Sequence, residues 1–127
     1  MSSANPLGAF CTQIINFFED LQDTYPEEKD ISTATQALKL MKMANPRRLH
    51  TAFMEIVTPD FRDRILSEDE EYLIQHAKAL LDQEYSDISF AFWIFDKHWS
   101  TMTHVNKKHI WNYLKTIVVL GQRVPPA

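Results

Sequence analysis

The chain has 127 residues, the length of a single domain, and carries 13 Lys and Arg against 17 Asp and Glu, a formal net charge of −4. This acidic balance disfavours a dedicated nucleic-acid-binding protein, which normally has a basic surface. The sequence has only two glycines, Gly8 and Gly121, whereas a β-rich fold with many tight turns needs more. The composition therefore favours helices.

The cysteine content and the N-terminus indicate a compartment. Cys11 is the single cysteine, so the chain cannot form an internal disulfide. The N-terminus lacks the charged and apolar regions of a signal peptide, and the longest apolar run, Phe90 to Phe95, is far shorter than the roughly 18 residues of a membrane span. We expect a soluble intracellular protein, of the cytosol or nucleus, with no membrane span.

Two Asn-Pro pairs predict where helices begin. Asn5-Pro6 and Asn45-Pro46 each place an N-cap side chain before a proline, whose missing N–H costs nothing in a first helical turn. The first predicted helix runs through about residue 23 and buries a stripe made of Leu7, Phe10, Ile14, Phe17, Phe18 and Leu21. Its C-terminal part carries acids that oppose the helix dipole without visible compensation, namely Glu19, Asp20 and Asp23.

The middle of the chain contains further start signals. Asp30 is predicted to cap a helix over 31–44, and Thr58-Pro59 ends the helix that Asn45-Pro46 opens. Ser67 to Glu70 has the spacing of a capping box that opens a helix to about Gln83. Asp87 would cap a central helix over 88–99, which is apolar nearly all round; a buried strand is the alternative, because a short apolar run does not separate the two.

The last predicted helix, over 103–120, has the clearest signals. Thr103 is a suitable N-cap, Gly121 is expected to end the helix as a left-handed C′ residue, and Pro125 and Pro126 prevent its continuation. Its apolar stripe consists of Ile110, Trp111, Leu114, Ile117 and Val118. Together the elements predict a compact single-domain all-α bundle of five to seven helices over residues 1–127, with short flexible tails at 1–4 and 122–127.

Charge alternates along the chain in blocks. Residues 1–30 carry a net charge of −5, residues 31–66 +3, residues 67–96 −7 and residues 97–127 +5. Blocks of opposite sign predict ion pairs within the fold; the alternative is a two-signed surface that docks a partner.

The residue types that support catalysis are poorly arranged for it. No two histidines lie four apart on one helix, and one cysteine cannot build a thiolate site. The consecutive acids at 68–71 point in different directions on a helix, and no glycine-rich phosphate loop or nucleophile elbow is present. His76 is expected to be a hydrogen-bonded core histidine and Cys11 a small core residue. We therefore expect no metal, no cofactor, no small-molecule substrate and no enzymatic activity.

Two sets of residues are candidates for binding a partner. The aromatic density of residues 88–99, with Trp111, exceeds what a small core readily hides; the exposed remainder would form a docking patch, with Phe92, Trp93 and Trp99 as its candidates. The alternative is that all of these aromatics are core. The basic candidates, for a protein partner or for nucleic acid, are Arg47, Arg48, Lys107 and Lys108.

Three stretches resemble a group of short all-helical proteins encoded by large nucleocytoplasmic DNA viruses. They are Phe17-Phe18 through Leu21 to Tyr25-Pro26, Ile65 to Tyr72, and the KHIWNYL sequence of Lys108 to Leu114. The chain departs from that group in its more aromatic 88–99 segment and in a final helix without a long apolar extension. The resemblance implies a viral protein expressed in a host cell, a virion component or host-interaction factor, and brings no catalytic residues.

The sequence thus predicts a non-enzymatic helical interaction or structural protein. Its partner would be another copy of itself or another viral or host protein, and a virion or assembly component is the form that the resemblance implies. The alternative function is a nucleic-acid-associated accessory factor that uses the basic block over residues 97–127.

Overall fold

The computed structural model describes residues 5–82 and 97–125. Within these ranges the chain is all-α, which confirms the predicted class. It forms six helices and a 3-10 turn, η1 (Trp99–Thr101): α1 (Pro6–Thr24), α2 (Lys29–Ala44), α3 (Pro46–Ile56), α4 (Pro59–Leu66), α5 (Glu70–Asp82) and α7 (His104–Arg123). The helix predicted over 88–99 lies, up to residue 96, outside the described residues.

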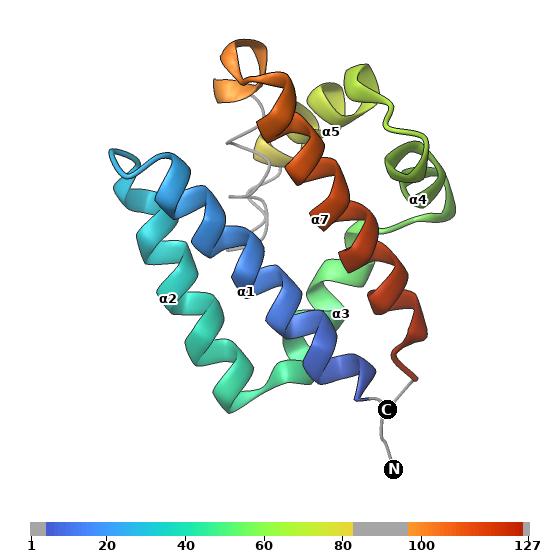
Figure 1. The fold of residues 1–127 in the computed structure, drawn as a ribbon. Coiled ribbons are helices and arrows are strands. Elements are labelled where there is room, and N and C mark those ends of the chain that lie inside the picture. The colour runs from blue at the N-terminus through green and yellow to red at the C-terminus, as the bar shows by residue number, and fades with distance from the viewer. Residues whose placement is uncertain (1–4, 83–96, 126–127) are drawn as a thin grey trace.

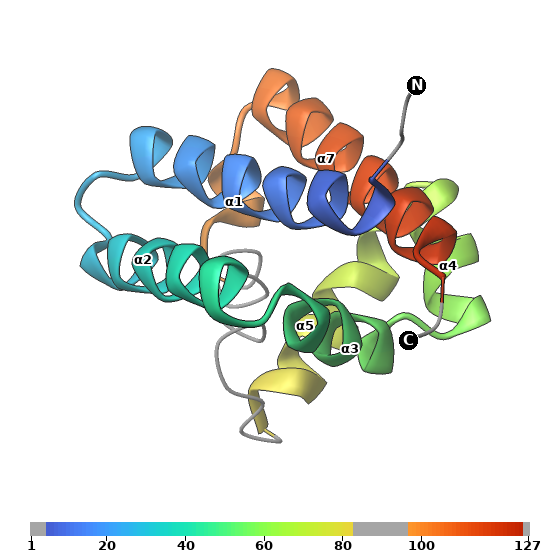
Figure 2. The same ribbon diagram turned by 90° about the horizontal axis from the view of Figure 1, so that it is seen from below.

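Helix α1 is the centre of the bundle. It packs against α2, α3 and α7, while α4 packs against α5 and α7. Figure 1 shows α2 and α7 on the two sides of α1. Figure 2 shows α1 and α7 along one side of the molecule and α3 and α5 along the opposite side. The predicted stripes of the first and last helices both face this core: the buried apolar residues include Phe10, Ile14, Phe17, Phe18, Leu21, Ile110, Trp111, Leu114, Ile117 and Val118.

Three of the predicted N-caps are confirmed. Asn5, Asn45 and Thr103 each accept a hydrogen bond from the backbone N–H three residues on, at 3.1, 3.2 and 3.1 Å. The first two precede a proline at the first helical position. Each cap satisfies an N–H that has no partner inside its helix, which fixes where the helix begins.

Two predicted caps are wrong. Glu28 rather than Asp30 occupies the N-cap position of α2, so that Asp30 lies in the first helical turn. Ser67 ends α4 instead of opening α5, and the side chain of Asp69 accepts from the backbone N–H of Tyr72 at 3.1 Å. The sequence between these helices turns at Glu68, whose φ of 57° interrupts the helical backbone where the capping box would have formed.

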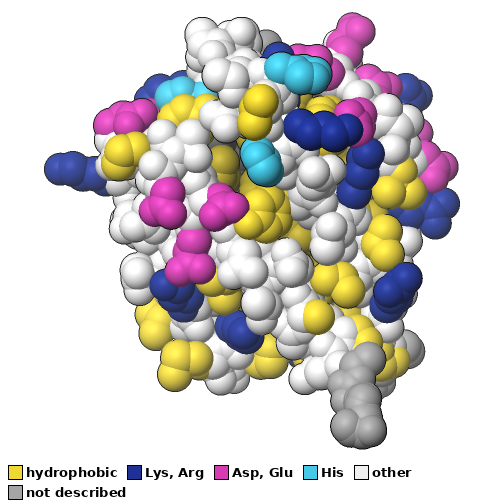
Figure 3. Space-filling model, viewed as in Figure 1, with side chains coloured by type: hydrophobic (Ala, Val, Ile, Leu, Met, Phe, Trp, Pro, Cys, Tyr) yellow, Lys and Arg dark blue, Asp and Glu magenta, His cyan; other side chains and the backbone are white. Residues whose placement is uncertain are grey.

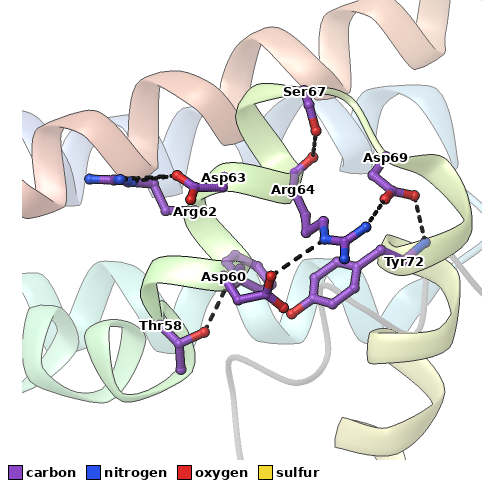
Figure 4. Close-up of polar contacts among 9 residues, drawn as sticks. Thr58, Asp60, Arg62, Asp63, Arg64, Ser67, Asp69 and Tyr72 are labelled. Carbon is purple, nitrogen blue, oxygen red and sulfur yellow. Dashed lines mark hydrogen bonds and ion pairs between the residues drawn. The ribbon is translucent and has the colours of Figure 1, made fainter.

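Arg64 holds the corner between α4 and α5 in place (Figure 4). Its guanidinium donates to Asp69 at 2.7 Å and to Asp60 at 3.4 Å, and it lies 5.5 Å from the centroid of the Tyr72 ring. The contact with Asp69 orients the carboxylate that caps α5. Arginine can make these contacts together because its planar guanidinium has several fixed donors and an apolar face.

Gly121 does not end the last helix, contrary to the sequence prediction. Helix α7 continues to Arg123, and none of the described glycines has a positive φ. A Cβ at this position would lie 2.8 Å from Met54 Sδ and 3.0 Å from Phe10 Cε1. The residue is glycine because α1 and α3 approach α7 closely here, and the left-handed conformation expected from the sequence plays no part.

Helix α3 also secures the residues after this glycine. The His50 imidazole donates from Nε2 to the carbonyl oxygen of Gly121 at 2.8 Å, and Arg47 donates to the carbonyl oxygen of Pro125 at 2.6 Å. Val124 is buried. Helix α7 thus extends past the predicted start of the tail at residue 122, and side chains of α3 bind the carbonyl groups of Gly121 and Pro125.

Ion pairs join charge blocks of opposite sign, as the sequence predicted. Glu68 pairs with Lys115, Glu70 with Lys107 at 3.0 Å, and Glu28 with Lys97 at 2.6 Å. Hydrogen bonds from these lysines are the main cause that lowers the pKa of all three glutamates. Ion pairs near a protein surface contribute little to stability, so the principal effect of these pairs is to fix which parts of the chain face each other.

We predict that Gly121→Val destabilises the protein by about 1–3 kcal/mol, because added core volume forces neighbouring side chains out of position. The matched control, Gln122→Val, places the same residue at the next, exposed position of α7 and should change the free energy of unfolding by less than about 0.5 kcal/mol. Urea denaturation followed by circular dichroism measures both. Equal losses for the two variants would contradict a packing role for Gly121.

We predict that stability falls as the pH drops below about 4.5. The folded-state pKa values of Glu28, Glu68 and Glu70 lie below the ordinary value of 4.5. Their contribution is therefore complete above that pH and is lost as the pH falls through the folded-state values. Urea denaturation between about pH 3 and 7 should show a shallower dependence for Glu70→Gln than for Glu71→Gln, a control at an exposed acid that accepts from Gln75.

Candidate functional site

The predicted basic residues do not form one surface. Arg47 lies beside Pro125 at the C-terminal end of α7, whereas Lys107 and Lys108 lie in the first turn or so of that helix. At about 1.5 Å per residue, the helix separates Lys108 from Gly121 by roughly 20 Å. Lys107 also pairs with Glu70, and Lys108 lies 3.9 Å from Glu68. Arg48 is exposed at the start of α3.

Trp99, predicted as a docking residue, belongs to the core. Its side chain is 1% exposed, and its ring meets that of Trp111 edge-on at 5.7 Å. The indole N–H donates to Glu70, and the Lys107 ammonium lies 5.0 Å from the ring centroid. Trp99 therefore presents almost no surface to a partner in this structure. Phe92 and Trp93 lie outside the described residues.

Cys11 and His76, both predicted to be core residues, pack inside the fold. Cys11 is buried with its Sγ 3.7 Å from the carbonyl oxygen of Pro46, and burial raises the pKa of the thiol. His76 packs against the rings of Phe61 and Tyr72, and burial lowers the pKa of its imidazole. Over residues 5–82 and 97–125, no three His, Cys, Asp or Glu side chains are grouped so that they could hold a metal ion.

A pocket of about 220 Å³ lies between the C-terminal half of α1 and the N-terminal half of α7. Buried apolar side chains form its floor, half-buried side chains its walls and exposed polar side chains its rim. The floor is Phe17, Leu21, Met102 and Ile110; the walls are Tyr25, Asn106 and Tyr113; the rim is Asp20, Asp23, Thr24 and His109. We call this the α1–α7 pocket.

Helical spacing explains why these residues share a pocket. Phe17, Asp20, Leu21 and Thr24 recur at intervals of three, one and three residues along α1, and Asn106, His109, Ile110 and Tyr113 repeat the same intervals along α7. This spacing places each set on one face of its helix. The two faces line the same pocket because α1 and α7 pack against each other.

The phenol of Tyr113 joins the two helices inside the pocket. It donates to Asp20 Oδ2 at 2.5 Å. Burial, this hydrogen bond and the charges of Asp20 and Glu19 raise the pKa of Tyr113 to about 12. Burial and the charge of Glu27 likewise raise the pKa of Tyr25. Both phenols are therefore neutral at physiological pH, and the surrounding charges that act on them are negative.

The charges around the pocket are separated by helix face. The lysines of α7 at positions 107, 108 and 115 turn toward Glu68 and Glu70, away from the residues that line the pocket. Figure 3 shows the result on the surface: acidic side chains gather over α1, histidine and basic side chains lie over α7, and apolar surface lies between them. Within the described part of the chain, Asp23 makes no ion pair or hydrogen bond through its carboxylate.

The sequence interpretation did not identify this pocket as a site, although it contained one signal. The acids near the end of α1 oppose the helix dipole, and the last turn of α1 contains no basic residue.

Comparison with family models, with curated proteins and with solved structures yields no match for this chain. None of the described helices is long and apolar enough to cross a membrane. The assignment of the α1–α7 pocket as a candidate site therefore rests on the geometry of this chain alone.

We predict no salt-dependent binding of DNA or RNA. Arg47, from α3, lies beside the C-terminal end of α7, whereas Lys107 and Lys108 lie near the N-terminal end of that helix. The two lysines already face carboxylates. Fluorescence anisotropy of labelled single-stranded and duplex oligonucleotides at low salt should remain unchanged as the protein is added. Binding that weakens linearly in log affinity against log salt would contradict the prediction.

Proposed function

We propose that the protein is a non-enzymatic interaction protein that binds a protein partner through the face containing the α1–α7 pocket. One observation carries the proposal: a surface pocket combines an apolar floor with a charged rim. Its volume of about 220 Å³ is below the range of about 300–1,000 Å³ typical of small-molecule sites. It therefore suits one anchoring side chain of a larger partner.

The chemistry of the pocket favours binding over catalysis. The pKa of about 12 keeps Tyr113 protonated at neutral pH, so that its phenol acts as a hydrogen-bond donor to Asp20. A general base needs a pKa near the working pH. The carboxylate of Asp23 is exposed to solvent on the rim, where it can contact an incoming charged group directly.

The resemblance to short all-helical proteins of large nucleocytoplasmic DNA viruses supports a more specific proposal. The partner would be a viral or host protein, and the chain would act in the virion, in its assembly or in contact with the host cell. The KHIWNYL stretch belongs to this resemblance, and it includes His109, Ile110 and Tyr113 of the pocket.

We predict that a photoreactive phenylalanine analogue at His109 crosslinks the partner in extracts of cells that express the protein. His109 is exposed on the rim of the pocket, so a bound partner must pass close to it. The control position is Gln36, which is exposed on α2. The product should form at position 109 and not at 36, and Asp23→Lys should reduce its yield. Equal products from both positions would contradict the proposed face.

A further inference from the structure

We propose that the α1–α7 pocket binds the guanidinium group of an arginine side chain presented by the protein partner. This inference rests on the proposed function and adds the chemistry of recognition. It follows from three features of the pocket: the sign of its charge, its aromatic walls and the placement of its two carboxylates.

The charge of the pocket calls for a cation. Asp20 and Asp23 lie on the rim near the C-terminal end of α1, where the helix dipole is also negative. The last turn of α1 contains no basic residue, and the described lysines of α7 face the acids at 68 and 70 instead. Asp20 already accepts a hydrogen bond from Tyr113, whereas Asp23 and the helix dipole have no compensating charge among the described residues. A bound cation would supply that charge.

Aromatic rings give the pocket an affinity for an organic cation in particular. The rings of Phe17 and Tyr113 lie 5.4 Å apart, and both line the pocket. The Tyr25 ring lines it as well and stacks on His98 at 4.2 Å, a contact that restricts its orientation. The faces of aromatic rings attract cations, and arginine makes such contacts more often than lysine.

The arrangement of the acids favours a guanidinium over an ammonium. Asp20 and Asp23 are three residues apart on one helix, so their carboxylates are neighbours on its surface. A guanidinium has five donors fixed in a plane, and it can donate to carboxylates at its edge while its face lies on an aromatic ring. An ammonium is a compact and strongly hydrated charge that gains less from the apolar floor made by Leu21, Met102 and Ile110.

Nuclear magnetic resonance of the ¹⁵N-labelled full chain tests the proposal. The probe is N-acetyl-arginine-N-methylamide, and the comparison ligands are the citrulline analogue, which is nearly isosteric and uncharged, and the lysine analogue. Arginine should shift backbone amides of α1 from 17 to 24 and of α7 from 106 to 113, in a saturable manner. The citrulline and lysine analogues should each bind at least about tenfold more weakly.

Variants separate this site from general attraction to an acidic surface. Asp23→Asn should weaken arginine binding several-fold, since it removes an exposed charge that has no ion pair or hydrogen bond with another described residue. The matched control is Asp63→Asn, which removes an exposed carboxylate paired with Arg62 on α4, and it should leave binding unchanged. Thermal unfolding of both variants confirms that the fold is retained.

Several results would overturn the proposal: equal binding of the citrulline analogue, tighter binding of the lysine analogue, shifts away from the pocket, or the same affinity in Asp23→Asn. Failure here is distinct from failure of the proposed function. A crosslink at His109 without arginine binding would overturn only the guanidinium assignment. Arginine binding without a crosslink at His109 would keep the assignment of the pocket and contradict the proposed partner face.

Discussion

The structure depends on the close packing of α1 and α3 against α7 at Gly121. The missing side chain lets Phe10 and Met54 approach the helix, and His50 binds the carbonyl group of the same glycine. These contacts involve three segments that are far apart in the sequence. Once they fix one end of the α1–α7 pair, the relation of the two helices at their other end is also set, and this is where Tyr113 meets Asp20 and the pocket forms. Packing at one end thus determines the geometry available for recognition at the other.

The sequence predicted what depends on neighbouring residues. Asn5, Asn45 and Thr103 cap helices as expected because a cap is a local contact between a side chain and a backbone N–H three residues on. The error at Gly121 arises because distant residues decide the outcome, whereas the errors at Asp30 and Ser67 lie within a few residues of the observed caps. Gly121 is suited by itself to end a helix, but its role comes from Phe10 and Met54, which no local pattern relates to it. Ser67 fits a capping box equally well, yet the arginine network at the α4–α5 corner assigns the cap to another residue.

The same reasoning explains why the sequence did not predict the pocket and why the predicted basic residues lie apart in the fold. The pocket combines faces from helices separated by about 80 residues, so neither face alone has the composition of a site. Lys107 and Lys108 stood out because no acid lies near them in the sequence; in the fold they face Glu70 and Glu68. By contrast, the acids of α1 appeared only as a mild local cost. A charged side chain without a partner beside a pocket is therefore a better indication of function than a stretch of like charges in the sequence. Such a stretch is readily neutralised by another part of the chain.

The position of Cys11 has a practical consequence. Its side chain is 0% exposed and lies between α1 and the start of α3, where the sulfur contacts the carbonyl oxygen of Pro46. Only a thiolate reacts quickly with alkylating or disulfide reagents, and burial both raises the pKa of the thiol and blocks access. Since the chain has a single cysteine, the rate at which such a reagent modifies it reports how often this contact opens in the native protein. The molecule therefore contains its own probe for local separation of the first and third helices.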